Sequence, residues 1–181
     1  TMKRKSEEKL FDFAYKDSMT GVYNRNAYEE RLQKLRRNSV NLNSITVVVA
    51  DLNGLKEINE TYGHHTGDET IKAVSSCLMK IIGEKADIYR VGGDEFVCIA
   101  ESNVLPHVSE FRDLFGFENT DRPIKLQIAI GYVRYDKKRH GTIDELIKDC
   151  EGRMCRDKKN QKQTLHKRRW CKLKDIKTKS I

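Results

Sequence analysis

The chain has 181 residues, of which 38% are apolar and 34% are charged, enough for one domain with a real core and a highly charged exterior. It contains no long uncharged apolar run and begins without a secretory pattern, so we expect no membrane segment and a cytoplasmic location, either alone or as the cytosolic part of a larger protein. The five cysteines form no Cys-x-x-Cys pair, and we expect them to be reduced thiols.

Most of the net charge of +8 comes from residues 158–179, which are rich in lysine and arginine. Basic tails can bind nucleic acid or anionic membranes, but more often they are solvated chain ends. Trp170 alone offers too little aromatic surface for base stacking, so we expect no nucleic-acid partner.

Two helices are predicted before the first strand. Residues 7–16 carry an apolar stripe among charges, and the polar segment 17–25 ends that helix. Asn24 can cap the next helix, which has Tyr28, Leu32 and Leu35 on one face.

The first predicted strand, residues 45–50, is almost entirely apolar and β-branched, which is typical of a strand buried on both faces. It ends at Asp51, a carboxylate that is costly there unless water, a metal or a positive group receives it. A short helix over residues 55–62 follows, and then a long helix that reaches Ile82 and that Thr66 or Asp68 can cap.

Residues 88–100 predict a β-hairpin, because two short apolar runs flank Gly92-Gly93-Asp94-Glu95. The glycines allow a positive φ and a close approach, and the paired acids suggest a hard-cation site, although a solvated acidic turn would have the same pattern. A helix over 106–117, a strand over 126–133 and a helix over 143–159 complete the chain. This order predicts an α/β (α+β) fold with a central mixed, mainly antiparallel sheet flanked by helices.

If the first strand lies beside the hairpin, Asp51, Asp94 and Glu95 gather at one edge of the sheet. Their repulsion favours cations there, and Mg²⁺ fits because it takes oxygen ligands and shares its shell with substrate phosphates. Two such ions could activate a hydroxyl and stabilise a leaving pyrophosphate. Lysines that could face those phosphates, or simply be solvated, are Lys56, Lys158 and Lys162. Together these residues predict a phosphoryl-transfer site.

Four segments of the sequence resemble the GGDEF domain of bacterial diguanylate cyclases. They are residues 17–25, 51–59, 62–68 and 90–96, the last containing an intact Gly-Gly-Asp-Glu-Phe. The resemblance covers residues 17–163, between a signalling helix in residues 1–16 and a basic tail in residues 164–181. It implies a palm-like sheet related to those of nucleotide cyclases and polymerases.

The resemblance implies a diguanylate cyclase, a nucleotidyltransferase that condenses two GTP into cyclic di-GMP and two pyrophosphates. Each 3′-hydroxyl would attack the α-phosphate of the GTP held by a partner domain, so the chain is expected to form a transient homodimer. Two Mg²⁺ ions per site, replaceable by Mn²⁺, and an upstream sensory domain are also implied.

Roles in catalysis follow from the same motif match. Asp51, Asp94 and Glu95, together with the Leu52 carbonyl, would hold the metal, and Asp94 would also accept the proton of the 3′-hydroxyl. Glu95 is the next carboxylate of the site, and Lys56 would stabilise charge at the phosphates.

Roles in substrate binding are implied in the same way. Asn59 and Asp68 would bond the guanine edge with His64 beside the nucleotide, and Asp68 can accept from the N1 and N2 hydrogens, which favours GTP over ATP. The residues that would lie at the triphosphate are Gly92, Gly93, Lys158 and Lys162.

The sequence departs from the family pattern at a few positions. Asn53 stands where a second Asp is frequent, and Lys162 replaces a common Arg and so loses its bidentate fork. Arg153 and Cys155 stand where a small residue and a Tyr are usual. Residues 83–87 lack the Arg of the Arg-x-x-Asp product-inhibition motif, so we expect that site to be absent.

Two other hypotheses remain open at this stage. The chain could be a catalytically weak or inactive GGDEF-like module that binds GTP or a partner protein, although Asp94 and Glu95, which such modules usually lose, are both present. A nucleic-acid-binding domain would leave the three carboxylates unexplained.

Overall fold

The structure, a computed structural model of the whole chain, describes residues 2–37, 42–108, 110–111 and 127–178. Its elements are α1 (Met2–Tyr15), α2 (Arg25–Arg37), the short η1 (Leu42–Ser44), β1 (Thr46–Asn53), α3 (Leu55–Tyr62), α4 (His64–Ile82), β2 (Asp87–Arg90), β3 (Glu95–Ala100), β4 (Gln127–Arg134) and α6 (Ile143–Thr178). Residues 105–108 and 110–111 are also helical, and the rest of the helix predicted over 106–117 lies outside the described residues.

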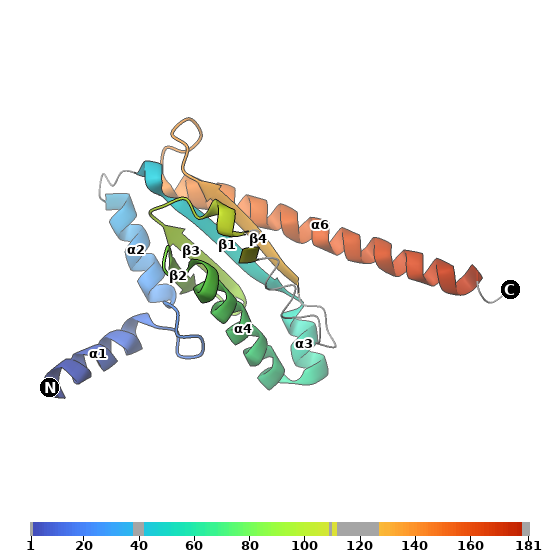
Figure 1. Cartoon of the computed structure of the whole chain (residues 1–181), viewed down its shortest axis with the longest axis horizontal. Helices are drawn as coiled ribbons and strands as arrows, with labels where there is room; N and C mark the ends of the chain where they lie inside the picture. The colour runs from blue at the N-terminus through green and yellow to red at the C-terminus, as the bar shows by residue number, and fades with distance from the viewer. Residues whose placement is uncertain (1, 38–41, 109, 112–126, 179–181) are drawn as a thin grey trace.

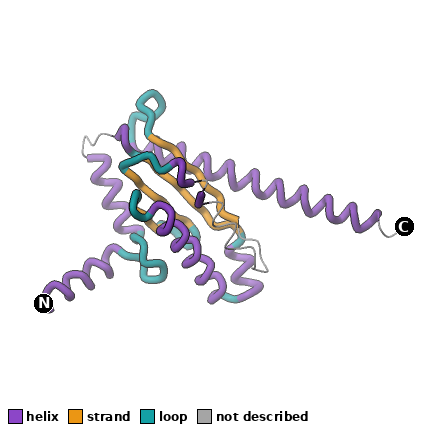
Figure 2. The backbone as a smooth tube through the Cα atoms, in the orientation of Figure 1, coloured by secondary structure: helices purple, strands orange, loops and turns teal. Residues whose placement is uncertain are grey.

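The four described strands form one sheet in the order β2-β3-β1-β4, and every neighbouring pair is antiparallel. Figure 2 shows the strands as one layer with helices around them. The prediction of a mainly antiparallel sheet flanked by helices is therefore confirmed. A mixed sheet would also contain parallel strand pairing. Among the described residues, the only parallel pairing is a single isolated bridge between Tyr23 and Tyr89.

Strand β1 lies at the centre of two apolar layers, as its continuous apolar run predicts. Val48, Ala50 and Leu52 face a core built with α3 and α4, and the alternate residues Val47 and Val49 face a second core built with α2 and α6. Figure 1 shows α4 on one side of the sheet and α6 on the other, with α1 projecting from one end and α6 running far beyond the sheet.

Three boundaries differ from the predictions. Strand β1 continues through Asp51 to Asn53, because pairing with β4 extends along its whole length. Helix α4 begins at His64 after Gly63, whose φ of 85° makes the sharp corner from α3, so Thr66 and Asp68 lie inside the helix rather than capping it. Helix α6 continues to Thr178, well past the predicted end at residue 159.

Helix α6 passes very close to strand β4 at Gly131. A Cβ atom on Gly131 would overlap the Cys150 carbonyl and would lie 2.5 Å from the Met154 backbone nitrogen. The glycine therefore lets the helix backbone rest directly on the sheet, and this contact places the next turn of α6, with Lys158, over the end of β1.

Candidate active site

The centre of the candidate site is the carboxylate of Asp51, which the fold buries near the end of β1. Asp51 is only 5% exposed, and its register partner on β3 is Glu95. Directly paired residues of antiparallel strands point to the same face, so both carboxylates lie on the face that α6 covers. Lys158 on α6 donates to Asp51 Oδ1 at 2.5 Å and provides the positive group that a buried carboxylate requires.

The hairpin tip is fastened to β1 and closed on itself. The Leu52 backbone N–H donates to the Asp94 carbonyl at 3.0 Å, and the Val91 N–H donates to the Glu95 carbonyl at 3.0 Å. Neither Gly92 nor Gly93 adopts a positive φ, so the conformational reason expected for these glycines is wrong. Gly92 instead leaves room for the Glu95 side chain, because a Cβ on Gly92 would lie 2.8 Å from Glu95 Oε2.

Arg90 clamps this tip to the segment that follows α1. Its guanidinium donates to the Gly93 carbonyl at 2.8 Å and to Asp17 Oδ1 at 3.1 Å. Asp17 also accepts from the Thr20 backbone N–H at 2.9 Å and the Thr20 hydroxyl at 2.6 Å. Partial burial alone raises the pKa of Asp17, but the bonds from Thr20 and Arg90 outweigh it and hold the pKa below its ordinary value.

A second network fixes α6 above the site. Asp157 accepts from the Ile130 backbone N–H at 2.9 Å and from Gln161 at 3.0 Å. Gln161 in turn donates to the Ile128 carbonyl and accepts from the Asn53 amide, both at 2.8 Å. The turn of α6 that carries Lys158 is therefore held to both β1 and β4.

The three predicted carboxylates lie near one another but do not form a ready-made metal cage. Within the described residues, no three His, Cys, Asp or Glu side chains are close enough to hold one ion. Like charges repel, and Asp51 is already paired with Lys158. Asp51 and Glu95, as cross-strand neighbours, are the pair that could hold a cation together.

The other predicted residues are distributed around this edge. Asn59 on α3 and Asp68 on α4 are half-buried across the corner between the two helices, whereas His64 is exposed. Lys56 is 88% exposed and lies 3.7 Å from Glu60, so it is not engaged with Asp51. Lys162 is exposed one turn beyond Lys158.

The structure gives the surroundings of three of the departures from the family pattern. Arg153 bonds Asp149 on its own helix at 3.2 Å and reaches the Tyr132 carbonyl at 3.5 Å, while Cys155 is exposed. Asn53, which replaces a frequent Asp, is the residue that bonds Gln161.

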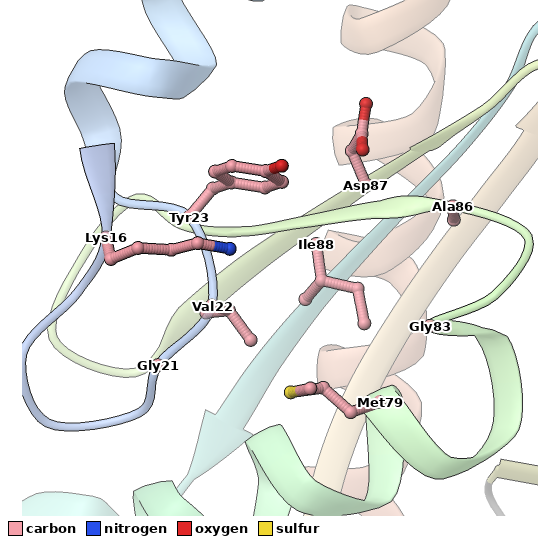
Figure 3. Close-up of a pocket in the computed structure, with 9 residues that line it drawn as sticks. All are labelled: Lys16, Gly21, Val22, Tyr23, Met79, Gly83, Ala86, Asp87 and Ile88. Carbon is pink, nitrogen blue, oxygen red and sulfur yellow. The ribbon is translucent and has the colours of Figure 1, made fainter. Parts of the chain in front are cut away.

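The region of residues 83–87 borders a cavity of about 210 Å³ between the loop after α1, the end of α4 and β2 (Figure 3). Its lining includes Lys16 and Asp87 as charged residues but, among the described residues, no arginine. The Lys16 ammonium lies 3.7 Å from the centre of the Tyr23 ring rather than free for an anion. The absence of a product-inhibition site stays a prediction.

Sequence reasoning missed the contacts that hold these parts in place. The bond between Asn53 and Gln161 joins residues 108 positions apart, and no local pattern signals it. The pair of Asp17 and Arg90 could have been suspected, because each stands in one of the segments that carry the resemblance.

Comparison with known protein families gives one match that covers most of the chain. The sequence matches the model of the family described as "Diguanylate cyclase, GGDEF domain" over residues 14–164. The chain belongs to the GGDEF domain family.

Individual relatives of this GGDEF domain match it in part. It is 34% identical over 102 residues to the cyclic di-GMP phosphodiesterase PdeR of Escherichia coli, covering 56% of this chain and 15% of PdeR. It is 34% identical over 89 residues to the diguanylate cyclase DgcS of Shewanella oneidensis, covering 49% of this chain and 30% of DgcS. The chain thus spans less than a third of either relative.

Among solved structures, the coiled coil and GGDEF domain of DgcB from Caulobacter crescentus, in complex with cyclic di-GMP, superposes with a TM-score of 0.76 at 20% identity and covers 87% of each chain. The diguanylate cyclase SiaD of Pseudomonas aeruginosa, in complex with its activator SiaC, gives a TM-score of 0.72 at 21% identity and covers 88% of this chain and 64% of SiaD. These likenesses establish the palm-like fold. Within the described residues, no helix has the length and apolar composition needed to cross a membrane.

Proposed function

We propose that this GGDEF domain is a diguanylate cyclase that condenses two GTP into cyclic di-GMP and two pyrophosphates. The observation that carries the proposal is the cross-strand pair of Asp51 and Glu95 beside the Asp94 tip, in a chain that belongs to the family. A fold with the family match but without these carboxylates would support only a binding module.

The residues present fit Mg²⁺, with Mn²⁺ as a substitute. Asp51 and Glu95 offer carboxylate oxygens on one face, the Leu52 carbonyl adds a third oxygen, and substrate phosphates would complete the shell. Asp51 already holds one cation, the ammonium of Lys158, so positive charge is favoured at this point. Two bound ions would supply activation of the 3′-hydroxyl and neutralisation of the leaving pyrophosphate.

The protein side chains would orient the substrate and move one proton. Asp94, whose backbone carbonyl fastens the tip of the hairpin to β1, would take the proton of the 3′-hydroxyl. Lys158 would exchange Asp51 for a phosphate, and the exposed Lys56, which lies 3.7 Å from Glu60, and the exposed Lys162 would approach the triphosphate. Asn59 and Asp68 would bond guanine, with His64 beside it.

A second copy of the chain is part of the proposal, because one domain would bind one GTP and the product joins two. The partner's GTP would present the α-phosphate to the 3′-hydroxyl held here. An upstream sensory domain attached through α1 and a cytoplasmic location are further parts of this proposal.

Replacing Asp94 with Ala tests the assignment. Turnover should be abolished, because the proton acceptor is gone, while the melting temperature should change little, because a tip residue contributes little to the core. Glu84→Ala, an exposed acidic position after α4 outside the proposed chemistry, serves as the control for a general effect of substitution. Full activity in Asp94→Ala would remove Asp94 from the mechanism.

A GTP-binding module that does not turn over is the alternative, and two observations favour it. Lys158 occupies Asp51, and no three-ligand cluster is preformed among the described residues. GTP that binds stoichiometrically and is recovered unconverted, at high protein concentration with Mg²⁺ or Mn²⁺, would establish this alternative.

A further inference from the structure

Gly67, in the first turns of α4, faces the side chain of Asn59 on α3. Gly67 is buried, and a Cβ atom there would overlap Asn59 Oδ1, lie 3.0 Å from Asn59 Cγ and lie 3.3 Å from Leu55 Cδ1. Its φ is not positive, so alanine suits the backbone, and an added Cβ would chiefly displace the Asn59 amide, with a second, milder contact at Leu55. The missing side chain of Gly67 thus forms a notch that receives the Asn59 amide.

The two sides of the Asn59 amide are in different surroundings. Oδ1 is buried against the notch and has no hydrogen-bond partner. Nδ2 makes no hydrogen bond within the described residues and is not fully buried, so part of it is accessible to solvent. Asn59 therefore presents a donor outward while its acceptor is covered.

The position of the notch explains this orientation. Gly67 closes the first turn of α4, near the positive end of the helix, and its own N–H donates to the Gly63 carbonyl at 3.4 Å. A carbonyl oxygen is favoured there, and an amide NH₂ group in its place would face that positive end. The same surroundings that bury Oδ1 therefore leave Nδ2 on the opposite side of the amide, away from the notch.

We infer that Gly67 is a positioning residue for base recognition, which fixes Asn59 as a hydrogen-bond donor to an acceptor atom of the base. This inference rests on the proposed function, because it needs guanine at Asn59. A donor from Asn59 and an acceptor from Asp68 together match guanine, which has the O6 acceptor beside its N1 and N2 hydrogens. Adenine presents an amino group where guanine has O6, so a fixed donor there disfavours ATP.

The test measures binding of 3′-deoxy-GTP with Mg²⁺ by calorimetry, since this analogue lacks the attacking hydroxyl and cannot be cyclised. Asn59→Ala should weaken binding about 2- to 12-fold, the range for one hydrogen bond. Gly67→Ala should weaken it by a similar factor, and the double variant should bind no more weakly than Asn59→Ala alone, because the colliding atom is already removed. Discrimination against 3′-deoxy-ATP should fall in both single variants.

Asn59→Asp tests the donor assignment without touching the notch. Aspartate has nearly the same shape but no donor, so it should bind 3′-deoxy-GTP at least as weakly as Asn59→Ala. Binding equal to the parent would show that Asn59 acts as an acceptor and would overturn the inference.

Gly152→Ala on α6 is the matched control, because it is also a helical glycine and an added Cβ there would come no closer than 3.8 Å to its neighbours. It should leave binding unchanged. If Gly67→Ala is too unstable to measure, the double variant should have a melting temperature close to that of Asn59→Ala and should bind as Asn59→Ala does. A double variant as unstable as Gly67→Ala would show that the collision with Asn59 is not the cause.

The outcomes separate the inference from the proposed function. No binding of 3′-deoxy-GTP by the parent chain would reject the proposed function itself. Weakened binding in Asn59→Ala with parent-like binding and discrimination in Gly67→Ala would leave the function standing and reject the positioning role of Gly67.

Discussion

Lys158 makes an ion pair that it would have to leave during the proposed reaction. In the structure it neutralises Asp51, which is 5% exposed, at a distance of 2.5 Å. In the proposed complex a metal takes over that carboxylate, and the ammonium is free for a phosphate. A single side chain thus links metal binding to nucleotide binding, because each is easier when the other has occurred.

Replacing Lys158 with Met should have opposite effects on the two ligands. Without metal, the variant should lose about 1–3 kcal/mol of unfolding free energy, less than for a fully buried pair because a third of the Lys158 side chain is exposed. Mn²⁺ alone should restore that stability and bind more tightly than to the parent, while 3′-deoxy-GTP should bind more weakly. Urea unfolding with and without Mn²⁺ and calorimetry measure these effects.

Lys159→Met is the control for this experiment, because Lys159 is the exposed neighbour on the same helix. It should change neither stability nor affinity for Mn²⁺. Weaker binding of Mn²⁺ to Lys158→Met than to the parent would mean that Asp51 is not the shared partner.

At the level of elements, the clamp made by Arg90 joins the segment after α1 to the hairpin of β2 and β3. One guanidinium contacts both Asp17 and the Gly93 carbonyl. A displacement of α1 would therefore reach the hairpin tip through two hydrogen-bonded contacts. The contacts of Arg90 therefore connect the hairpin tip that carries Asp94 to the segment that follows the first helix.

The clamp predicts a pH dependence of stability. The pKa of Asp17 is lowered in the folded state, so its contribution is fully present above the unfolded value of about 3.9 and is lost as the pH falls through the folded pKa. Asp17→Asn should therefore be less stable than the parent at pH 7, and the difference should shrink below about pH 4. Urea unfolding at a series of pH values checks this; a difference that stays constant down to pH 2.5 would exclude the charge of Asp17 as its source.

The sequence patterns predicted elements better than contacts between them. The apolar run of β1 and the Gly-Gly turn predicted the central strand and the hairpin, because both signals are local. The start of α4 was predicted too late, since the sharp turn at Gly63 lets the helix begin before its polar capping candidates. The notch at Gly67 and the bond from Asn53 to Gln161 arise from packing of distant segments, which periodicity does not report.

At the scale of the whole molecule, α1 leaves the sheet and exposes apolar side chains. Leu10, Phe11 and Phe13 are 66%, 50% and 89% exposed. We expect this helix to pair two chains and so to raise the concentration of one half-site near the other.

Specific activity should therefore rise with protein concentration, approximately in proportion while dimers are a minority. Fusion of a dimeric coiled coil before α1 should raise activity at low concentration and remove the dependence. Initial rates over a hundredfold range of concentration measure this. A specific activity that is constant over the range in the unfused chain would contradict assembly as the limiting step.

The central claim is tested most directly by the products formed from GTP. The chain, at high concentration with Mg²⁺, should convert GTP into cyclic di-GMP and release two pyrophosphates for each cyclic di-GMP formed, as resolved by chromatography and a pyrophosphate assay. The Asp94→Ala variant should form neither. Bound GTP recovered intact from the parent chain, with no cyclic di-GMP at any protein concentration, would contradict the account.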